Sequence, residues 1–384
     1  MSKCFRNTSE KIGVFLSYRS PSEGGSYTIT NDILDTILKT YRKSNNLIFV
    51  TLNDRKKILK KKVNKAGHQC LCVEENLLLL KIKSFFFSLF PKLLKTYNFL
   101  NLNQYLNLQK KYKINTVWFV SAEYYFPLFS KYISTVWDLQ HKTHAQFPEV
   151  GSFFRKIYRE MVIKNFLISS YKIITGSSLL IKILKTNYNI NRNKIIFNQH
   201  PTPTIFLKEP IRKKTFNHVN YFLYPANFWQ HKNHLNLFLG FFNFNKKNNF
   251  KYKLILVGDI KDKLYFRTIK LKFKNHFKKN FLIFSFVSLE KLINLYDYSL
   301  ALVYSSFAGP ENLPPLEAMA RKKPIICSNY PGSKEQLKNI PIYFNPYCVL
   351  SIEKAFIKFI SAKRKKNYFI RSSENYVAKV LNEI

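Results

Sequence analysis

The chain has 384 residues and a formal net charge of +41, because 63 Lys and Arg outnumber 22 Asp and Glu. Its apolar content of 46% excludes a disordered or low-complexity chain, and its length suits two domains with separate cores. No stretch reaches the roughly 18 apolar residues that a membrane span needs. The five cysteines lack zinc-type spacing, so we expect reduced thiols in a cytoplasmic protein.

The excess of positive charge has two explanations, and the sequence leaves both open. Lys, Asn, Ile, Phe and Tyr are abundant together, which is the bias of an AT-rich genome. A surface that binds an anionic partner would also account for the charge. A nucleic-acid partner is not favoured, because no zinc finger, RNP aromatic motif or KH loop occurs.

The first predicted strand is Lys11–Tyr18, and the helix Asn31–Tyr41 and the strand Leu47–Leu52 follow it. Gly24 and Gly25 stand between the first strand and the helix. Glycines there let a ligand phosphate or an acceptor approach the backbone, so both are candidates for that side of a site. Their spacing is not G-x-G-x-x-G, so a dinucleotide fingerprint is not supported.

The segment Lys81–Lys113 mixes basic and aromatic residues, with Phe85–Phe87 and Phe90 among several lysines. Such a stretch can bind anionic lipid headgroups as a peripheral membrane element. It can equally be a pair of helices that turn apolar side chains to the core and lysines to solvent. Pro91 favours two helices over one.

Further short strands are expected in the first half at Thr116–Val120, Ile133–Trp137, Lys172–Thr175 and Lys194–Phe197. Strands that alternate with helices predict an α/β fold with a parallel, doubly wound sheet. The strand at Trp137 leads into Asp138, Leu139, Gln140 and His141, and then into Phe147-Pro148-Glu149. Asp138 is a candidate site residue or a helix N-cap.

Prolines and a basic run at His200–Lys214 predict a domain linker. We therefore expect an N-terminal Rossmann-like domain at 1–208, a second at 215–365, and a helix within 366–384, read as Tyr368–Ile384, that returns to the first domain. The second half restarts with the strand Tyr221–Tyr224, the helix His234–Phe242 and the strand Lys253–Val257, which ends at Gly258-Asp259. Two such sheets across a cleft place a ligand at the carboxyl ends of their strands.

The run Tyr224–His234 follows the first strand of the second half. Lys232, in a strand-to-helix loop, is well placed to neutralise a diphosphate. His231 and His234 could donate further hydrogen bonds. They lack an acidic or cysteine partner nearby, so no metal is expected there.

The run Ser305–Met319 reads as strand, Gly-Pro turn, double proline and helix. This arrangement points backbone N–H groups at an anion. We expect Glu317 in the first turn, at the mouth of a cleft, where it accepts hydrogen bonds from a sugar or ribose hydroxyl. An ordinary strand–turn–helix joint with a dipole-favoured Glu is the alternative.

The segment 288–353 resembles the C-terminal signature of the retaining family 4 glycosyltransferases, and the likeness is specific over about 130–150 and 221–350. It includes Leu295-Tyr296, Leu313–Ala320 (LPPLEAMA), Lys323–Ile326 and Ser328–Gln336. The resemblance implies the GT-B fold: two Rossmann-like domains that face each other across a cleft. It is weak before residue 115.

The resemblance also implies roles for individual residues. Lys232 matches the lysine that binds the leaving diphosphate, Glu317 matches the glutamate that holds the ribose, and Asp138 matches the Asp of an H-D pair. Three positions depart from the common pattern: Trp137 replaces His, Asn227 replaces Arg, and Gly309 replaces the first glutamate, for which Glu311 is the substitute. WDLQH, N-x-FWxHKNH and GPxNxPPLEA together resemble one branch of the family. Candidate donor-binding residues are Asn227, Gly258, Gly309, Pro310, Asn312 and Leu313, and His141 is an acceptor-side candidate.

The resemblance therefore implies a cytoplasmic or peripheral membrane glycosyltransferase that uses a nucleotide-sugar and a glycan or lipid-linked acceptor in surface polysaccharide synthesis. No metal or other cofactor is expected, since such enzymes usually need no divalent metal and no Asp-x-Asp motif stands at a strand end. The departing phosphate can take the acceptor proton, so no strong side-chain base is needed. Loss of the usual His, Arg and first Glu motivates an alternative, a GT-B-like protein that binds sugar nucleotides or glycans without transfer. A basic nucleic-acid binder is motivated by charge alone.

Overall fold

The computed structural model describes residues 10–17, 20–42, 44–52, 56–125, 129–209, 219–361 and 368–384. The chain forms two compact units. The first contains the residues up to His141, Gly151–Gln199 and Ser373–Ile384, and the second contains Lys142–Val150 and His200–Ser372. Lys142–Val150 thus lies with the second unit, although the sequence boundaries placed it in the first. Parts of the expected linker and domain ends, 210–218 and 362–367, lie outside the described residues.

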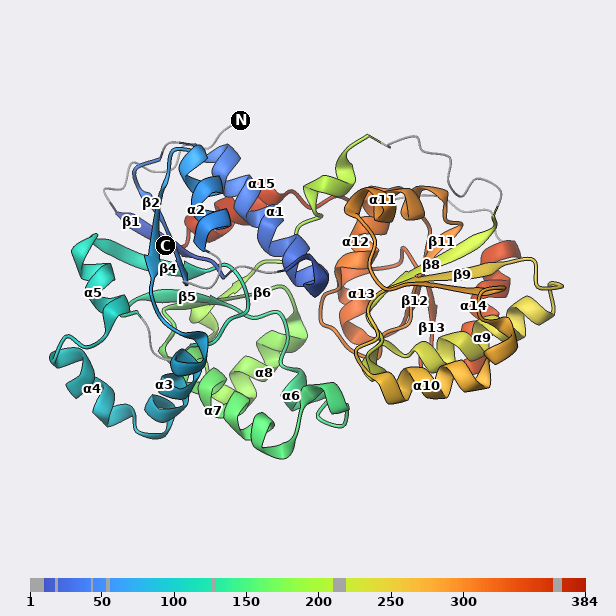
Figure 1. The fold of residues 1–384 in the computed structure, drawn as a ribbon, viewed down its shortest axis with the longest axis horizontal. Coiled ribbons are helices and arrows are strands. Elements are labelled where there is room, and N and C mark those ends of the chain that lie inside the picture. Colours follow the sequence, from blue (N-terminus) through green and yellow to red (C-terminus); the bar gives the residue numbers. More distant parts are fainter. Residues whose placement is uncertain are drawn as a thin grey trace. The chain divides into compact units, whose positions relative to one another are not determined.

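The first unit is built on a parallel sheet of seven strands in the order β3-β2-β1-β4-β5-β6-β7 (Figure 1). The strands are β1 (Lys11–Phe15), β2 (Leu47–Leu52), β3 (Gln69–Val73), β4 (Ile114–Phe119), β5 (Tyr132–Thr135), β6 (Lys172–Thr175) and β7 (Ile195–Phe197). β2 and β6 have the expected bounds. β3 was not expected, and Tyr18, the expected end of the first strand, lies outside the described residues.

Helices connect these strands. They are α1 (Gly25–Thr40), α2 (Lys56–Lys65), α3 (Leu77–Leu89), α4 (Pro91–Phe99), α5 (Gln104–Lys111), α6 (Gln140–Thr143, which spans the boundary of the units), α7 (Phe153–Ser169), α8 (Ser178–Tyr188) and α15 (Ser373–Leu381). α1 begins six residues earlier than the expected Asn31, and Pro91 begins a new helix as expected. None of the described helices is long and apolar enough to span a membrane.

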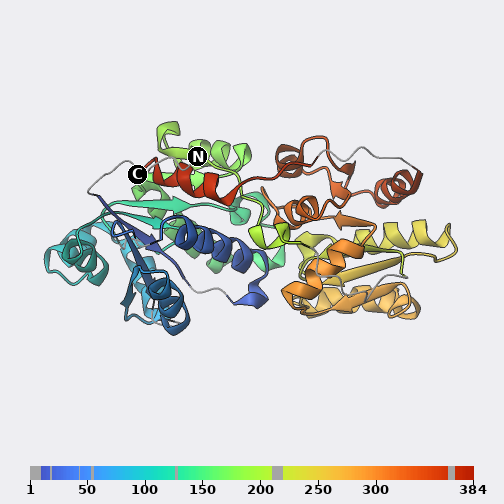
Figure 2. The same cartoon turned by 90° about the horizontal axis from the view of Figure 1, so that it is seen from above.

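The last helix, α15, packs beside α1 in the first unit (Figures 1 and 2). The Asn198 side chain donates to the Tyr376 carbonyl at 3.0 Å, and Lys379 Nζ donates to the Phe197 carbonyl at 2.7 Å. The Ser373 hydroxyl donates to the buried carboxylate of Asp32. The helix is shorter than the expected Tyr368–Ile384.

The second unit has a parallel sheet of six strands in the order β10-β9-β8-β11-β12-β13. Its strands are β8 (Tyr221–Pro225), β9 (Lys253–Val257), β10 (Phe281–Phe284), β11 (Ala301–Tyr304), β12 (Ile325–Ser328) and β13 (Ile342–Phe344). Its helices are α9 (His234–Lys246), α10 (Lys263–Lys272), α11 (Leu289–Tyr298), α12 (Leu313–Ala320), α13 (Pro331–Leu337) and α14 (Val349–Ser361). The expected doubly wound parallel arrangement is confirmed in both units.

Phenylalanine fills the core of the second unit. Phe222, on the central strand β8, contacts the rings of Phe241, Phe244 and Phe356 at centroid separations of 6.1, 6.1 and 4.9 Å. These rings join the sheet to α9 and α14, because Phe241 and Phe244 lie in α9 and Phe356 in α14. Large buried aromatic side chains of this kind dominate core energetics and hold the strand ends in fixed positions.

Candidate donor site in the second unit

The strand order of the second unit defines where a ligand binds. β8 and β11 are neighbours, and the chain continues from β8 to β9 on one side and from β11 to β12 on the other. Such a switch point opens a crevice at the carboxyl ends of the two strands, where open α/β sheets bind their ligands. The loops at this position are 226–233 and 305–312, which carry most of the residues singled out from the sequence.

Lys232 lies at the end of a short 3-10 helix, η6 (Gln230–Lys232), directly before α9. Asn233 adopts a left-handed conformation with φ of 57° and turns the chain into that helix. The backbone carbonyl of Lys232 accepts hydrogen bonds from the hydroxyls of Tyr224 and Ser305, so the residue is fixed from both neighbouring strands. Its Nζ donates to the Tyr304 hydroxyl at 2.9 Å.

Tyr304 connects Lys232 to the opposite loop. Its hydroxyl accepts from Lys232 and donates to Asn312 Oδ1 at 2.8 Å, and Asn312 Nδ2 donates to the Gly309 carbonyl at 3.0 Å. Burial, above all, raises the pKa of Tyr304 well above its ordinary value, so the hydroxyl stays neutral. This series of hydrogen bonds holds the Lys232 ammonium group beside the Gly309–Leu313 turn, which was expected to bind an anion.

The turn at Gly309–Leu313 offers fewer backbone donors than the sequence suggested. Pro310 has no N–H, and the N–H of Asn312 donates to Gln336 Oε1 at 3.0 Å. The backbone donors that this turn can present to a ligand are therefore those of Gly309, Glu311 and Leu313. Gly309 has a φ of 120°, which disfavours any residue with a side chain.

Glu317 does not lie where the sequence placed it. It is the fifth residue of α12 and only 5% exposed, because the helix already begins at Leu313. Its carboxyl accepts a hydrogen bond of 2.7 Å from the Tyr296 hydroxyl of α11. Burial raises the pKa of Glu317 to about 7, and the hydrogen bond from Tyr296 opposes that shift only in part. The expectation of a first-turn carboxylate at the mouth of a cleft was therefore wrong.

Glu311 also has protein partners. Its Oε1 accepts from the backbone N–H of His200 at 2.9 Å, and the Arg371 guanidinium lies 4.0 Å from the same oxygen. The side chain is 4% exposed. Glu311 therefore links His200, at the start of the segment His200–Ser372, to Arg371 near its end. In this arrangement it does not present both carboxylate oxygens to a sugar.

Asn227 and Gly258 stabilise the backbone at the ends of β8 and β9. Asn227 Oδ1 accepts from the backbone N–H of Asp259 at 2.8 Å. A Cβ on Gly258 would lie 2.3 Å from the Ala226 carbonyl oxygen, so only glycine fits. Asn227 therefore ties two loops together, and Gly258 permits their close approach.

The two histidines of this loop face protein groups. His231 donates its backbone N–H to Glu149 at 2.9 Å, and its ring Nδ1 contacts the same carboxylate oxygen. His234 is fully buried and stacks on Phe228 at 4.2 Å, and burial lowers its pKa to about 3. The idea that these rings supply donors to a ligand was wrong for His234, which is a neutral core residue.

The remaining candidates lie in the first unit. Asp138 Oδ1 accepts from the backbone N–H of Gln140 at 3.1 Å, which fits the helix-capping alternative. His141 Nε2 lies 3.0 Å from Glu160 Oε2. Gly24 has a φ of 62° with nothing near its Cβ position, and Gly25 is the exposed first residue of α1. The contacts of Asp138 and His141 are with groups of the first unit itself.

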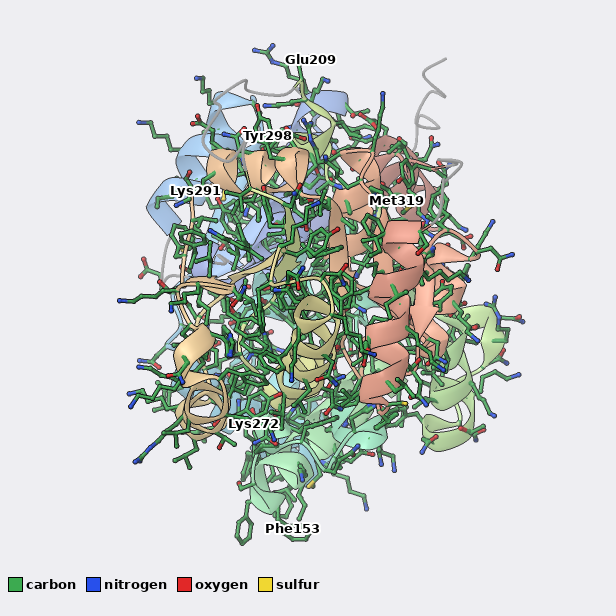
Figure 3. The ribbon with its side chains drawn as sticks, turned by 90° about the vertical axis from the view of Figure 1, so that its right-hand side faces the viewer. Phe153, Glu209, Lys272, Lys291, Tyr298 and Met319 are labelled. Carbon is green, nitrogen blue, oxygen red and sulfur yellow. The ribbon has the colours of Figure 1, made fainter. Side chains whose placement is uncertain are left out.

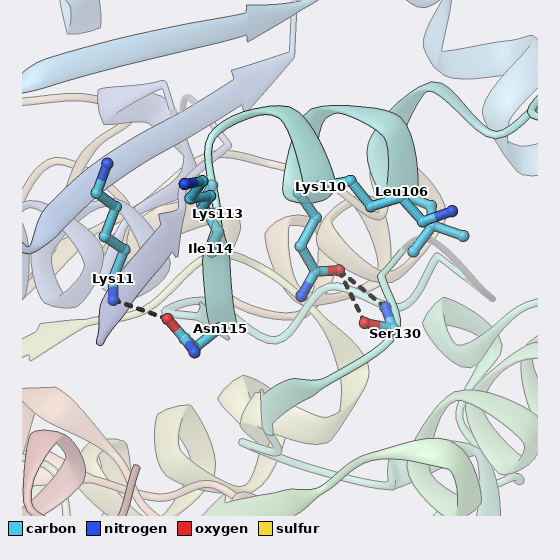
Figure 4. A pocket seen from close by; sticks show the side chains of 8 residues that line it. Lys11, Leu106, Lys110, Lys113, Ile114, Asn115 and Ser130 are labelled. Atoms are coloured by element: carbon cyan, nitrogen blue, oxygen red, sulfur yellow. Dashed lines mark hydrogen bonds between the residues drawn. The ribbon is translucent and has the colours of Figure 1, made fainter. Parts of the chain in front are cut away.

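A hollow of about 710 Å³ lies at the other edge of the first sheet, at the amino ends of β1 and β4 (Figure 4). Lys11, Lys110 and Lys113 line it, and the backbone N–H of Lys11 donates to Asn115 across it. No sequence pattern predicted this hollow. Within the described residues, no group of His, Cys, Asp and Glu is arranged to hold a metal ion.

Comparison with known proteins finds a family match for most of the second unit. Residues 208–376 match the family described as glycosyl transferases group 1. The matched region includes Lys232, Tyr304 and Glu317, and so contains both loops of the switch point.

Comparisons with whole proteins extend the likeness beyond residues 208–376. It is 30% identical over 259 residues to the O-antigen chain mannosyltransferase RfbU of Salmonella typhimurium strain LT2, and the match spans 66% of each chain. A glycosyltransferase from Rickettsia africae superposes with a TM-score of 0.63 at 16% identity, covering 97% of this chain and 94% of that one. Anabaena Alr3699/HepE in complex with UDP and glucose gives 0.62 at 13% identity, covering 97% and 95%. The fold of the chain is that of the GT-B glycosyltransferases.

Three residues at or near the β8–β11 switch point were not assigned a role from the sequence: Tyr304, Glu149 and Gln336. Tyr304 ends a buried strand and could have been noted as a polar group at a strand end. Gln336 caps the Asn312 backbone from α13. Glu149 is remote in sequence from its partner His231, and no local pattern joins them.

Proposed function

We propose that the chain is a retaining, family 4-like glycosyltransferase that moves a sugar from a nucleotide-sugar to a glycan or lipid-linked acceptor during surface polysaccharide synthesis in the cytoplasm. The observation that carries the proposal is Lys232, held at the β8–β11 switch point by Tyr304. A leaving diphosphate gains charge as the glycosidic bond breaks, and a fixed cation there stabilises that charge. The family match and the mannosyltransferase relative support the same reaction.

The other residues of the site have supporting roles in this proposal. The N–H groups of Gly309, Glu311 and Leu313 add donors for phosphate oxygens. Glu317 is buried and bonded to Tyr296, so it joins α12 to α11 and is not assigned a ribose contact. The departing phosphate oxygen takes the acceptor proton, so no side-chain base is required. Lys232 supplies positive charge at the diphosphate, so we expect transfer without a divalent metal and in the presence of a chelator.

The decisive experiment measures thermal shift and sugar transfer with UDP-, GDP-, ADP- and dTDP-sugars, mannose donors first. Lys232→Ala is compared with Lys261→Ala, a lysine at the end of β9 that pairs with Asp259 at 3.0 Å. We expect one nucleotide class to stabilise the wild type and the Lys261 variant. The Lys232 variant should lose that stabilisation and about 10²-fold or more in turnover.

A second candidate is a protein that binds a sugar nucleotide without transfer. Glu311 favours it, because its carboxylate is already bonded to His200 and near Arg371. Asn227 also brings no charge where the family resemblance implies Arg. Nucleotide-dependent stabilisation with no turnover across the donor panel would select this candidate, and no stabilisation by any nucleotide would contradict both.

A further inference from the structure

Helix α3 of the first unit exposes more large apolar side chains than it buries. Leu80 and Phe87 are buried in the core, and the same buried face contains Ser84 and Ser88, whose hydroxyls bond back to the carbonyls of Leu80 and Ser84 within the helix at 2.8 and 2.7 Å. Five other large apolar side chains point outward: Leu78, Leu79, Ile82, Phe86 and Leu89 are 65, 54, 56, 43 and 44% exposed. An exposed apolar stripe of this size on a protein surface marks an interaction site.

Helix α4 extends this surface. None of its nine residues is buried, although it contains Leu93 and Phe99, which are 49% and 84% exposed. It is held to α3 by the contact of Phe87 with Tyr97, at a ring separation of 4.9 Å. We call the exposed apolar side chains of these two helices the α3–α4 face.

The first residues of α7 add to the α3–α4 face at the end where α3 begins. Tyr158 donates to the Lys81 carbonyl and Asn165 to the Ser88 carbonyl, so α7 runs alongside α3 in the same direction. The first residues of α7 therefore lie near the first residues of α3. They are Phe153 and Phe154, 71% and 81% exposed, and Phe153 projects away from the ribbon (Figure 3).

The charge on this surface has one sign. Residues 77–122 contain no Asp or Glu, but they contain lysines at 81, 83, 92, 95, 110, 111 and 113. Lys83 pairs with Glu75 at 2.5 Å, whereas Lys81, Lys92 and Lys95 make no ion pair with any residue that the structure describes. Apolar side chains with lysines at their border are the composition of a surface that lies in the headgroup layer of an anionic membrane.

We propose that the α3–α4 face docks the protein on an anionic lipid bilayer. A second copy of the chain is disfavoured as the occupant, because pairing two such faces would bring lysine against lysine on proteins of net charge +41. A nucleic acid would neutralise the lysines but leave the Leu and Phe side chains in water. Only an anionic bilayer satisfies both components, and the inference holds whether or not the second unit transfers a sugar.

The test is co-sedimentation of the full chain with vesicles of phosphatidylcholine alone or mixed with phosphatidylglycerol. We expect binding to the mixed vesicles, at least about tenfold weaker binding to the neutral ones, and weakening by added salt. The charge variant Lys81→Gln/Lys92→Gln/Lys95→Gln should lower the partition coefficient by more than about tenfold, since each lysine near the surface is worth about fivefold. The apolar variant Phe86→Ser/Leu93→Ser should lose binding as well.

A matched control is Leu264→Ser/Leu271→Ser on α10, which removes two leucines that are 77% and 66% exposed among lysines of the second unit. It should bind as the wild type does. An unchanged thermal midpoint checks that each variant is folded. A Phe99→Trp variant reports insertion directly, through a blue shift of its emission with mixed vesicles.

Four results would overturn the proposal. They are absence of sedimentation, equal binding to both kinds of vesicle, an equal loss in the α10 control, or dimerisation in solution that Phe86→Ser/Leu93→Ser abolishes. The last would identify a second copy of the chain as the occupant.

Discussion

The carboxylate of Glu149 accepts hydrogen bonds from both the backbone N–H and the ring Nδ1 of His231. Glu149 follows the first-unit motif in the sequence, yet its segment, Lys142–Val150, folds as part of the second unit. The residue after His231 is Lys232, so this carboxylate positions the backbone of the proposed phosphate-binding loop.

We expect Glu149→Ala to destabilise the protein by about 2 kcal/mol, because it leaves a buried N–H without its acceptor. Burial opposes ionisation of Glu149, but the hydrogen bonds from His231 outweigh burial and lower its pKa. The stabilisation is therefore present above the ordinary carboxyl pKa and is lost as the pH falls through the lowered one. Denaturant titrations of both proteins at neutral and acidic pH measure this. Glu149→Gln, which keeps an acceptor, should lose less, and equal losses would contradict the assigned role.

Tyr304→Phe should separate Lys232 from the Asn312 turn without disturbing the strand. The variant leaves Asn312 Oδ1 without its donor, at a cost of about 1–2 kcal/mol. In the proposed reaction we expect kcat/KM to fall about tenfold, since Lys232 is no longer held in place.

The matched control for that variant is Tyr343→Phe. The Tyr343 hydroxyl donates to the Lys338 carbonyl at 2.6 Å, away from Lys232. The Tyr343→Phe variant should retain the wild-type kcat/KM, measured in the same sugar-transfer assay. A loss as large as that of Tyr304→Phe would show that the hydroxyl acts through general stability alone.

Glu317→Gln should change how stability depends on pH. The folded protein keeps the Glu317 proton up to a pH of about 7, whereas the unfolded chain releases it near its ordinary value of 4.5. Between these limits the wild type loses stability as the pH rises, by on the order of 3 kcal/mol, and the neutral Gln does not. The difference in unfolding free energy between the two proteins, followed from pH 4 to pH 8, measures this.

Tyr296→Phe provides a second check on Glu317. It removes the hydrogen bond that lowers the pKa of Glu317, so the upper limit of the pH window should move to higher pH. A difference between wild type and Glu317→Gln that stays constant with pH would refute the assignment.

Gly258→Ala should be strongly destabilising. The added methyl would lie 2.3 Å from the Ala226 carbonyl oxygen and 2.6 Å from the Asn227 amide nitrogen, and both are backbone atoms that cannot move alone. We expect a loss of about 3 kcal/mol in unfolding free energy. Gly24→Ala meets no atom within 4 Å, so its cost is that of the strained backbone alone (φ 62°, ψ −123°), on the order of 1–2 kcal/mol. Equal losses would contradict the close-approach argument.

Short apolar runs bounded by polar residues or Gly were sufficient to predict many of the strands. Leu47–Leu52, Lys172–Thr175 and Lys253–Val257 are found with the expected bounds. β3 was missed because QCLCV is short and half of its signal is cysteine, a residue of no clear strand preference. The doubly wound order followed from the alternation of elements, which constrains topology strongly.

The site was less accessible to sequence reasoning than the fold. Lys232 and the Gly309 turn were identified because their residue types are unusual at a strand end. Glu317 was misplaced because the helix begins at Leu313, before the double proline, which turns the carboxylate inward. Glu149 with His231 and Glu311 with His200 are contacts between residues 82 and 111 positions apart, which no local pattern encodes.

The bond between Ser373 and Asp32 joins residues 341 positions apart within one unit. During synthesis the ribosome makes the whole second unit before it makes α15. The second unit can thus fold while the first still lacks a helix, and while Asp32 of α1 still lacks its hydrogen bond from Ser373. The unit whose first residues are translated first is therefore the unit that is completed last. The α3–α4 face emerges from the ribosome as part of a unit that still lacks its last helix.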